Sequence, residues 1–151
     1  MRAILFAIML QVSASTPHPA PSLTPTEVVT IVLNALKHND DPRPDAGIAT
    51  VFEFASPANR IATGPLPRFA GMIKNPAYRV MLGYRSATRG RLELDGPHAR
   101  QRVVIVGQDG SQVTYVFLLS KQPDGPYADC WMTDGVIRQK DPEPPPGTTA
   151  T

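Results

Sequence analysis

The chain has 151 residues, of which 42% are hydrophobic and 19% are charged, a composition typical of one globular domain with its own core. The formal net charge of +2 is too small to indicate binding to nucleic acid or to an anionic membrane surface. Proline is frequent, at 17 residues, and is concentrated near the two ends, at positions 17–25 and 142–146. The ends are therefore expected to lie outside the folded domain.

The N-terminus has the pattern of a signal peptide. Arg2 supplies a positive charge, the run over 3–12 is almost wholly apolar, and Val12-Ser13-Ala14 offers the small residues that a signal peptidase recognises. This run is shorter than the roughly 20 residues that span a bilayer, so no membrane span is expected in the mature chain. The alternative is a buried N-terminal strand or helix. We expect cleavage after Ala14 and export, as a secreted or periplasmic protein, with an organelle lumen as the alternative location.

These patterns divide the chain into four segments. They are a signal peptide over 1–14, a proline-rich linker over 15–23, a single domain over 24–138 and a disordered proline-rich tail over 139–151. The single cysteine, Cys130, has no partner for an internal disulfide. Because it lies in an apolar segment, it is expected to be buried.

The first half of the domain predicts helices. Thr24-Pro25-Thr26-Glu27 is typical of a capping box, and the helix that it starts is expected to end near His38. A second helix is predicted over 45–55. Ser-Pro, Gly-Pro and Asn-Pro pairs beginning at positions 56, 64 and 75 then start three short helices, the last of them closed by Gly83. Because helices this short are unstable alone, they must pack on another layer.

From residue 84 onward the apolar period changes from that of a helix to that of a strand. Strands are predicted over 91–95, 103–106, 112–120 and 130–138, and Asp109-Gly110 is typical of a hairpin turn between two of them. Helices followed by strands predict an α+β fold. In this fold the N-terminal helices pack on a curved antiparallel sheet of about four strands.

Three segments carry a resemblance to a known family: FASPANRIATGPLPRFAGMIKNPAY, LSKQPDGPYADCWMTDGV and VVTIVLNALKHND. Together they resemble domain of unknown function family 4864, over about Thr24 to Ile137. The helices-then-sheet layout is similar to the nuclear transport factor 2-like, or cystatin-like, cone. The resemblance implies a fold without an assigned activity, because this superfold hosts isomerases, dehydratases, small-ligand binders and assembly proteins.

Asp134 is the candidate catalytic residue. A carboxylate on the last strand that faced an apolar cavity would have a raised pKa and could act as a general base or acid. Strand alternation places Asp134 on the same face as Met132. The alternative is that Asp134-Gly135 forms a bulge or strand end, with the carboxylate bonded to nearby backbone.

Arg60, Tyr78, Tyr84 and Trp131 are candidates for lining a ligand pocket. Arg60 could anchor an anion in the cavity or pair with an acidic neighbour such as Glu53. Either tyrosine could donate a hydrogen bond to a ligand. Trp131 lies in an apolar strand and is expected to be a core anchor.

No metal or cofactor is predicted. The three histidines have no Asp, Glu or Cys at metal-ligand spacing, and the chain contains no phosphate-binding or dinucleotide motif. The sequence therefore favours a small exported binding or assembly domain over an enzyme. Its partner would be a protein or a small apolar ligand, and a homodimer formed through the sheet is one such assembly. The alternative is a cofactor-independent isomerase or lyase that acts on a small apolar molecule through Asp134.

Overall fold

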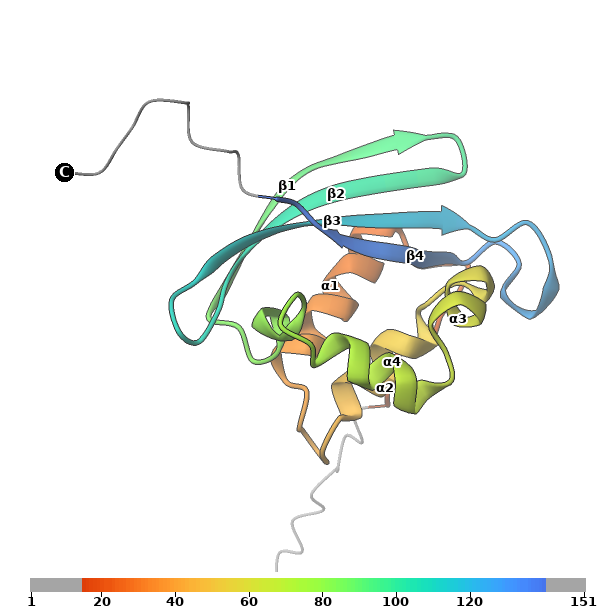
Figure 1. Ribbon diagram of the computed structural model, residues 1–151. Helices are drawn as coiled ribbons and strands as arrows, with labels where there is room; N and C mark the ends of the chain where they lie inside the picture. The colour runs from red at the N-terminus through yellow and green to blue at the C-terminus, as the bar shows by residue number, and fades with distance from the viewer. Residues whose placement is uncertain (1–14, 141–151) are drawn as a thin grey trace, which may run out of the picture.

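The computed structural model describes residues 15–140 and has a helical layer packed on one antiparallel sheet. The predicted signal peptide and residues 141–151 of the predicted tail lie outside the described residues. Figure 1 shows the four strands as an open, curved sheet with the helices on one side of it. This arrangement confirms the predicted α+β fold class. The helices are α1 (Pro25–Lys37), α2 (Ala46–Glu53), α3 (Pro57–Thr63) and α4 (Leu66–Ile73).

The predicted capping box is present at the start of α1. The backbone N–H of Glu27 donates to Thr24 Oγ1 at 3.2 Å, and the Glu27 carboxylate accepts from the backbone N–H of Thr24 at 2.7 Å. Hydrogen bonds from Thr24 also hold the pKa of Glu27 below its usual value. Each bond satisfies a backbone or side-chain group at a helix end that has no intrahelical partner. One side of α1 then faces the core, through Val28, Val29, Val32, Leu33 and Leu36.

The junction between α1 and α2 depends on Asn39 and Gly47. The buried Asn39 side chain accepts from the backbone N–H of Ile48 at 2.9 Å and donates to Asp45 at 3.0 Å. The N–H of Gly47 donates to the Asn39 carbonyl at 2.9 Å. A Cβ at Gly47 would lie 1.9 Å from the Ala35 carbonyl oxygen, so only glycine permits this approach of the two helices.

The last predicted helix, from Asn75 to Gly83, is reduced to one 3₁₀ turn, η1 (Arg79–Met81). The side chain of Asn75 accepts from the backbone N–H of Ala77 at 2.8 Å and forms a turn instead of a helix start. Gly83 closes the segment with a φ of +60°, as a residue without Cβ readily does.

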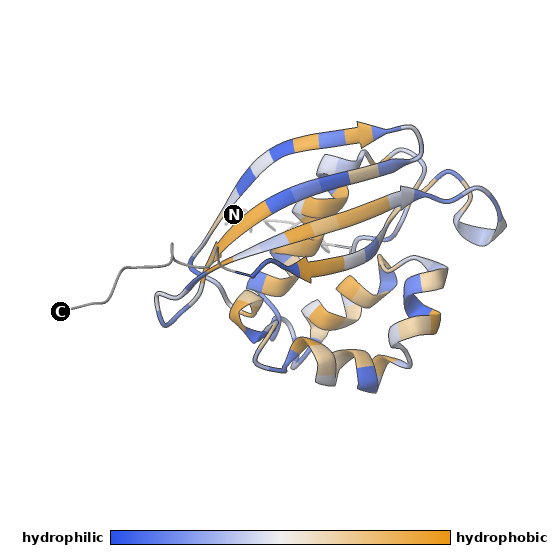
Figure 2. Ribbon diagram, turned by 45° about the horizontal axis from the view of Figure 1, so that its top comes forward, coloured by the Kyte–Doolittle hydropathy of each residue, from blue (hydrophilic) through white to orange (hydrophobic). Residues whose placement is uncertain are grey.

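The sheet has the strand order β1-β2-β3-β4, and each strand is antiparallel to the next. Gly96 and Gly110, with φ of +54° and +82°, turn the chain between the first three strands, which confirms the predicted hairpin at Asp109-Gly110. Figure 2 shows polar and apolar residues alternating toward the end of β1, whereas most of β3 is apolar. The strands are β1 (Ser86–Asp95), β2 (His98–Val106), β3 (Gln112–Lys121) and β4 (Trp131–Arg138).

Strands β1 and β2 are longer than predicted. β1 lies at the edge of the sheet and is exposed over most of its length, and its first half, residues 86–90, has no apolar alternation. The first inward positions of β2 are Ala99 and Gln101, one small and one polar. Neither produces the apolar period that marks a half-buried strand.

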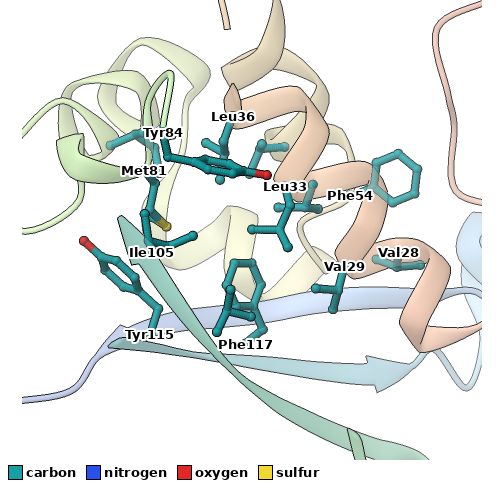
Figure 3. Close-up of a cluster of buried hydrophobic side chains, with 14 of the residues drawn as sticks. Val28, Val29, Leu33, Leu36, Phe54, Met81, Tyr84, Ile105, Tyr115 and Phe117 are labelled. Carbon is teal, nitrogen blue, oxygen red and sulfur yellow. The ribbon is translucent and has the colours of Figure 1, made fainter. Parts of the chain in front are cut away.

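The core lies between the helices and the inner face of the sheet (Figure 3). Val29 and Leu33 of α1 approach Phe117 of β3, and Tyr84 lies beside Met81 and Leu36. Cys130 is buried, as predicted, and its burial raises the pKa of the thiol. Trp131 was expected to be a core anchor but is only half-buried and packs at the margin of the cluster, because it opens β4 at the end of the sheet.

Hydrogen bonds along the outer edge of β4 join the two layers. The backbone N–H of Thr133 donates to the Phe54 carbonyl, and the N–H of Ser56 donates to the Thr133 carbonyl, both at 2.8 Å. The Thr133 hydroxyl also donates to the Phe54 carbonyl at 3.1 Å. The short segment between α2 and α3 therefore covers part of a sheet edge that would otherwise be open. No helix among residues 15–140 is long and apolar enough to cross a membrane.

We predict that Thr133→Val lowers the free energy of unfolding by about 0.5–1.5 kcal/mol, the usual contribution of one hydrogen bond. The buried hydroxyl would be lost while the size and the strand preference of the side chain are kept. Urea unfolding measures the change. Thr114→Val is the matched control, because Thr114 lies half-buried on β3 without a side-chain hydrogen bond to any described residue. Equal losses in the two variants would contradict the role of the hydroxyl.

Candidate functional site

An apolar pocket lies between the helices and β4, with a cavity volume of about 260 Å³. It is the hollow in which the helices and the inner face of the sheet do not close completely. We call it the apolar pocket and define it by its lining: Val32, Leu36, Val51, Asn59, Ala62, Thr63, Phe69, Met72, Ile73, Tyr78, Met81, Thr133, Asp134, Gly135 and Val136.

The polar side chains at the apolar pocket are all bonded to protein groups. Tyr78 donates its hydroxyl to the Val136 carbonyl at 3.0 Å, and Asn59 donates its amide to the Thr133 carbonyl at 3.0 Å. Thr63 donates to the carbonyl of Asn59 at 2.7 Å. The bonds of Tyr78 and Asn59 hold the pocket wall to β4, the bond of Thr63 lies within α3, and the interior is left apolar. The arrangement suits a ligand that is held by contact with carbon atoms.

Asp134 borders the apolar pocket, but its carboxylate is bonded elsewhere. Leu118 pairs with Gly135 and Leu119 pairs with Thr133, so Asp134 is the extra residue of a β-bulge. It is exposed, and its carboxylate accepts from the Ser120 hydroxyl at 2.8 Å. Ser120 lies on the face of the sheet opposite the helices, between the inward Leu119 and the end of β3. This geometry favours the structural interpretation of Asp134 over the catalytic one.

Arg60 joins three segments and does not line the apolar pocket. Its guanidinium donates to the carbonyls of Phe52 at 3.1 Å and Ala55 at 3.0 Å, and to the carbonyl of Glu53. It also donates to the Tyr127 hydroxyl at 3.1 Å, in the loop between β3 and β4. A cation at the C-terminal end of α2 is stabilised by the helix dipole. Arg60 therefore bonds the backbone of Glu53, whereas the sequence suggested its carboxylate.

The other two candidates lie apart from the apolar pocket. Tyr84 is 6% exposed and belongs to the core, with Lys37 Nζ 5.5 Å from its ring centre. Burial raises the pKa of its phenol. Trp131 packs against the margin of the core. Of the residues singled out in the sequence, the structure brings only Tyr78 and Asp134 to the apolar pocket.

The described residues offer no site for a metal ion. Among residues 15–140, no three side chains of His, Cys, Asp or Glu are grouped so that they could hold one. His18 is paired with Glu53, where the N-terminal segment passes α2.

A comparison with models of protein families identifies the family of this chain. The family model described as a domain of unknown function (DUF4864) matches residues 22–145. The chain belongs to the DUF4864 family. Searches of the curated proteins and of the solved structures gave no match.

Most of the pocket wall in this DUF4864 protein was not predicted as a site. The apolar faces of α1 and α4 are visible in the sequence, but they give the same signal whether they fill a core or line a hollow. Met72, Ala62 and Gly135 carry no chemical signal. These residues line a pocket because α3 and α4 do not pack closely on β4. That spacing depends on long-range contacts, such as the hydrogen bond between Asn59 and Thr133, which are 74 residues apart.

We predict that Asp134→Ala lowers the free energy of unfolding by at most about 1.5 kcal/mol, because the bond that it removes is exposed. Binding of an apolar probe in the apolar pocket should be unchanged. Urea unfolding and probe titration measure the two effects. Asp124→Ala is the control, at an exposed aspartate in the loop before β4. Loss of probe binding in Asp134→Ala alone would restore Asp134 as a pocket residue.

Proposed function

We propose that this DUF4864 protein is a small binding domain whose apolar pocket takes a small apolar molecule. The observation that carries the proposal is the combination of an apolar lining with polar side chains that are already bonded to the protein. A ligand that needed hydrogen bonds would have to break these contacts, whereas an apolar ligand keeps them. Burial of apolar surface then supplies the binding free energy.

The size of the apolar pocket limits the ligand. About 260 Å³ is less than the roughly 300–1,000 Å³ of pockets that hold drug-sized molecules. A molecule of one ring or two fused rings, or a short alkyl chain, therefore fits better than a lipid or a dinucleotide. Ala62, an exposed residue on α3, lies at the margin of the pocket and marks the side from which a ligand could enter.

The alternative is an isomerase or lyase that acts in the same pocket. It would need a group that moves a proton, and Asp134 is the only carboxylate among the described residues of the lining. That carboxylate would have to leave Ser120 on the outer face and turn toward the apolar pocket. General acid–base catalysis requires the catalytic group to lie within hydrogen-bond reach of the substrate. We therefore favour a binding function over a catalytic one.

We further propose that the protein is exported and that its fold belongs to the nuclear transport factor 2-like superfamily. The sequence pattern over 1–14 supports export. Helices inside the curve of an antiparallel sheet support the superfamily proposal (Figure 1). Sequencing of the protein from its native host would find Ser15 first if the signal is cleaved as proposed, and an intact Met1 would contradict export by this route.

We predict that Ala62→Phe weakens binding of indole by about tenfold or more, because the added ring fills the pocket margin. Indole is a small apolar probe of suitable size, and its binding can be followed by NMR titration. Ala58→Phe is the matched control, since Ala58 lies one turn earlier on α3, is exposed and does not line the apolar pocket. Equal affinity in the two variants, or no binding by the unmodified protein, would contradict the proposed site.

A further inference from the structure

A second hollow, of about 530 Å³, lies on the outer face of the sheet, away from the helices. Residues on β1, β2 and β3 and the residue after β4 line it. We call it the arginine hollow, and its lining is Gly90, Arg91, Glu93, Arg100, Arg102, Val116 and Gln139.

A β-bulge delivers the third arginine to this face. Arg89 pairs with Val103 and Leu92 pairs with Gln101, so Gly90 and Arg91 together stand opposite Arg102. Arg89 lies on the helix-facing side of the sheet, where its exposed side chain donates to Thr30 of α1 at 2.7 Å, and Leu92 packs against the core. Without the extra residue, strict alternation would turn Arg91 inward as well.

The bulge is held in place by specific contacts. The side chain of Gln101, which is 6% exposed, donates to the Gly90 carbonyl at 2.8 Å. A Cβ at Gly90 would lie 3.4 Å from the Arg102 carbonyl oxygen, an ordinary contact distance, so the two strands lie side by side at the bulge. Arg91 and Arg102 are therefore held as neighbours across the β1–β2 ladder.

Two of the three guanidinium groups have no counter-ion among the described residues. Arg100 is paired with Glu93. In residues 15–140, no hydrogen bond or ion pair engages the side chain of Arg91 or Arg102. Like charges that face each other across a ladder destabilise a sheet. Placing Arg91 beside Arg102 therefore does not stabilise the sheet by itself. An anion bound between the two guanidinium groups would offset their repulsion.

We propose that the arginine hollow binds a phosphate-type dianion. Guanidinium groups present N–H donors in a fixed fork that matches the oxygens of phosphate, and two such groups match a double negative charge. The half-buried Val116 lies in the same lining and gives an organic part of the ligand an apolar contact. The site lies on the opposite face of the sheet from the apolar pocket and does not depend on the function proposed for it.

Titration of the full chain with inorganic phosphate tests the site, at a mildly alkaline pH where phosphate is a dianion. Sodium chloride at matched ionic strength is the salt control. Phosphate should shift the backbone amide signals of β1 and β2 around the bulge and should raise the melting temperature. In Arg91→Gln/Arg102→Gln the affinity should fall by about tenfold or more. Arg68→Gln, an exposed position on α4 outside the hollow, is the control for loss of positive charge and should bind as the unmodified chain does.

A second measurement separates binding from a structural role. Without phosphate, Arg102→Gln should melt at or above the temperature of the unmodified chain, because repulsion from Arg91 is removed. A lower melting temperature for Arg102→Gln would mean that the arginine stabilises the fold and would overturn the proposal. The same holds if the double variant responds to phosphate as the unmodified chain does. Tighter binding of the dicarboxylate succinate than of phosphate would overturn the phosphate assignment.

Discussion

The fold depends on one set of hydrogen bonds, those between Thr133 and the segment that joins α2 to α3. The helices α2, α3 and α4 have 7 or 8 residues each, too short to be stable alone. They need a fixed attachment to the sheet, and Thr133 supplies it with its backbone N–H, carbonyl and hydroxyl. Asn59 adds a fourth bond from α3 to the same carbonyl. Arg60 then ties the carbonyl end of α2 to the loop before β4.

This attachment also accounts for the position of the apolar pocket. The helices are held to β4 at Thr133 and again at Val136, where Tyr78 donates its hydroxyl. Between these two points lies the bulge at Asp134, where β4 departs from regular pairing. Side chains of α3 and α4 therefore do not interdigitate fully with the strand there. The pocket is a consequence of joining short helices to a strand at two points, one on either side of its bulge.

The sequence predicted those parts of the fold that depend on local interactions. The capping box at Thr24, the first two proline-started helices and the turn at Gly110 each use neighbouring residues, and the structure contains them. The sequence did not show which side chains would meet across long separations. Arg60 donates to backbone carbonyls and forms no ion pair with Glu53, and Trp131 packs at the margin of the core. The bulge at Arg91 was hidden too, because residues 86–90 before it have no apolar period that an extra residue could interrupt. The sequence therefore indicated which residues could form polar or aromatic contacts, but it did not indicate which partners they would contact in the fold.

The long separation between the partners of this attachment has a consequence for folding kinetics. Thr133 and Phe54 are 79 residues apart, and β4 is the last strand of the sheet in chain order. Closing a loop of this length must precede any gain from the contact, so such pairings form slowly compared with local ones. The hairpins among β1, β2 and β3 can form from adjacent segments, but the segment between α2 and α3 cannot be attached at Thr133 until β4 has been synthesised and paired. Until then a growing chain leaves apolar residues of α2, α3 and α4 without their cover from β4, and this is the stage at which a chaperone would recognise it.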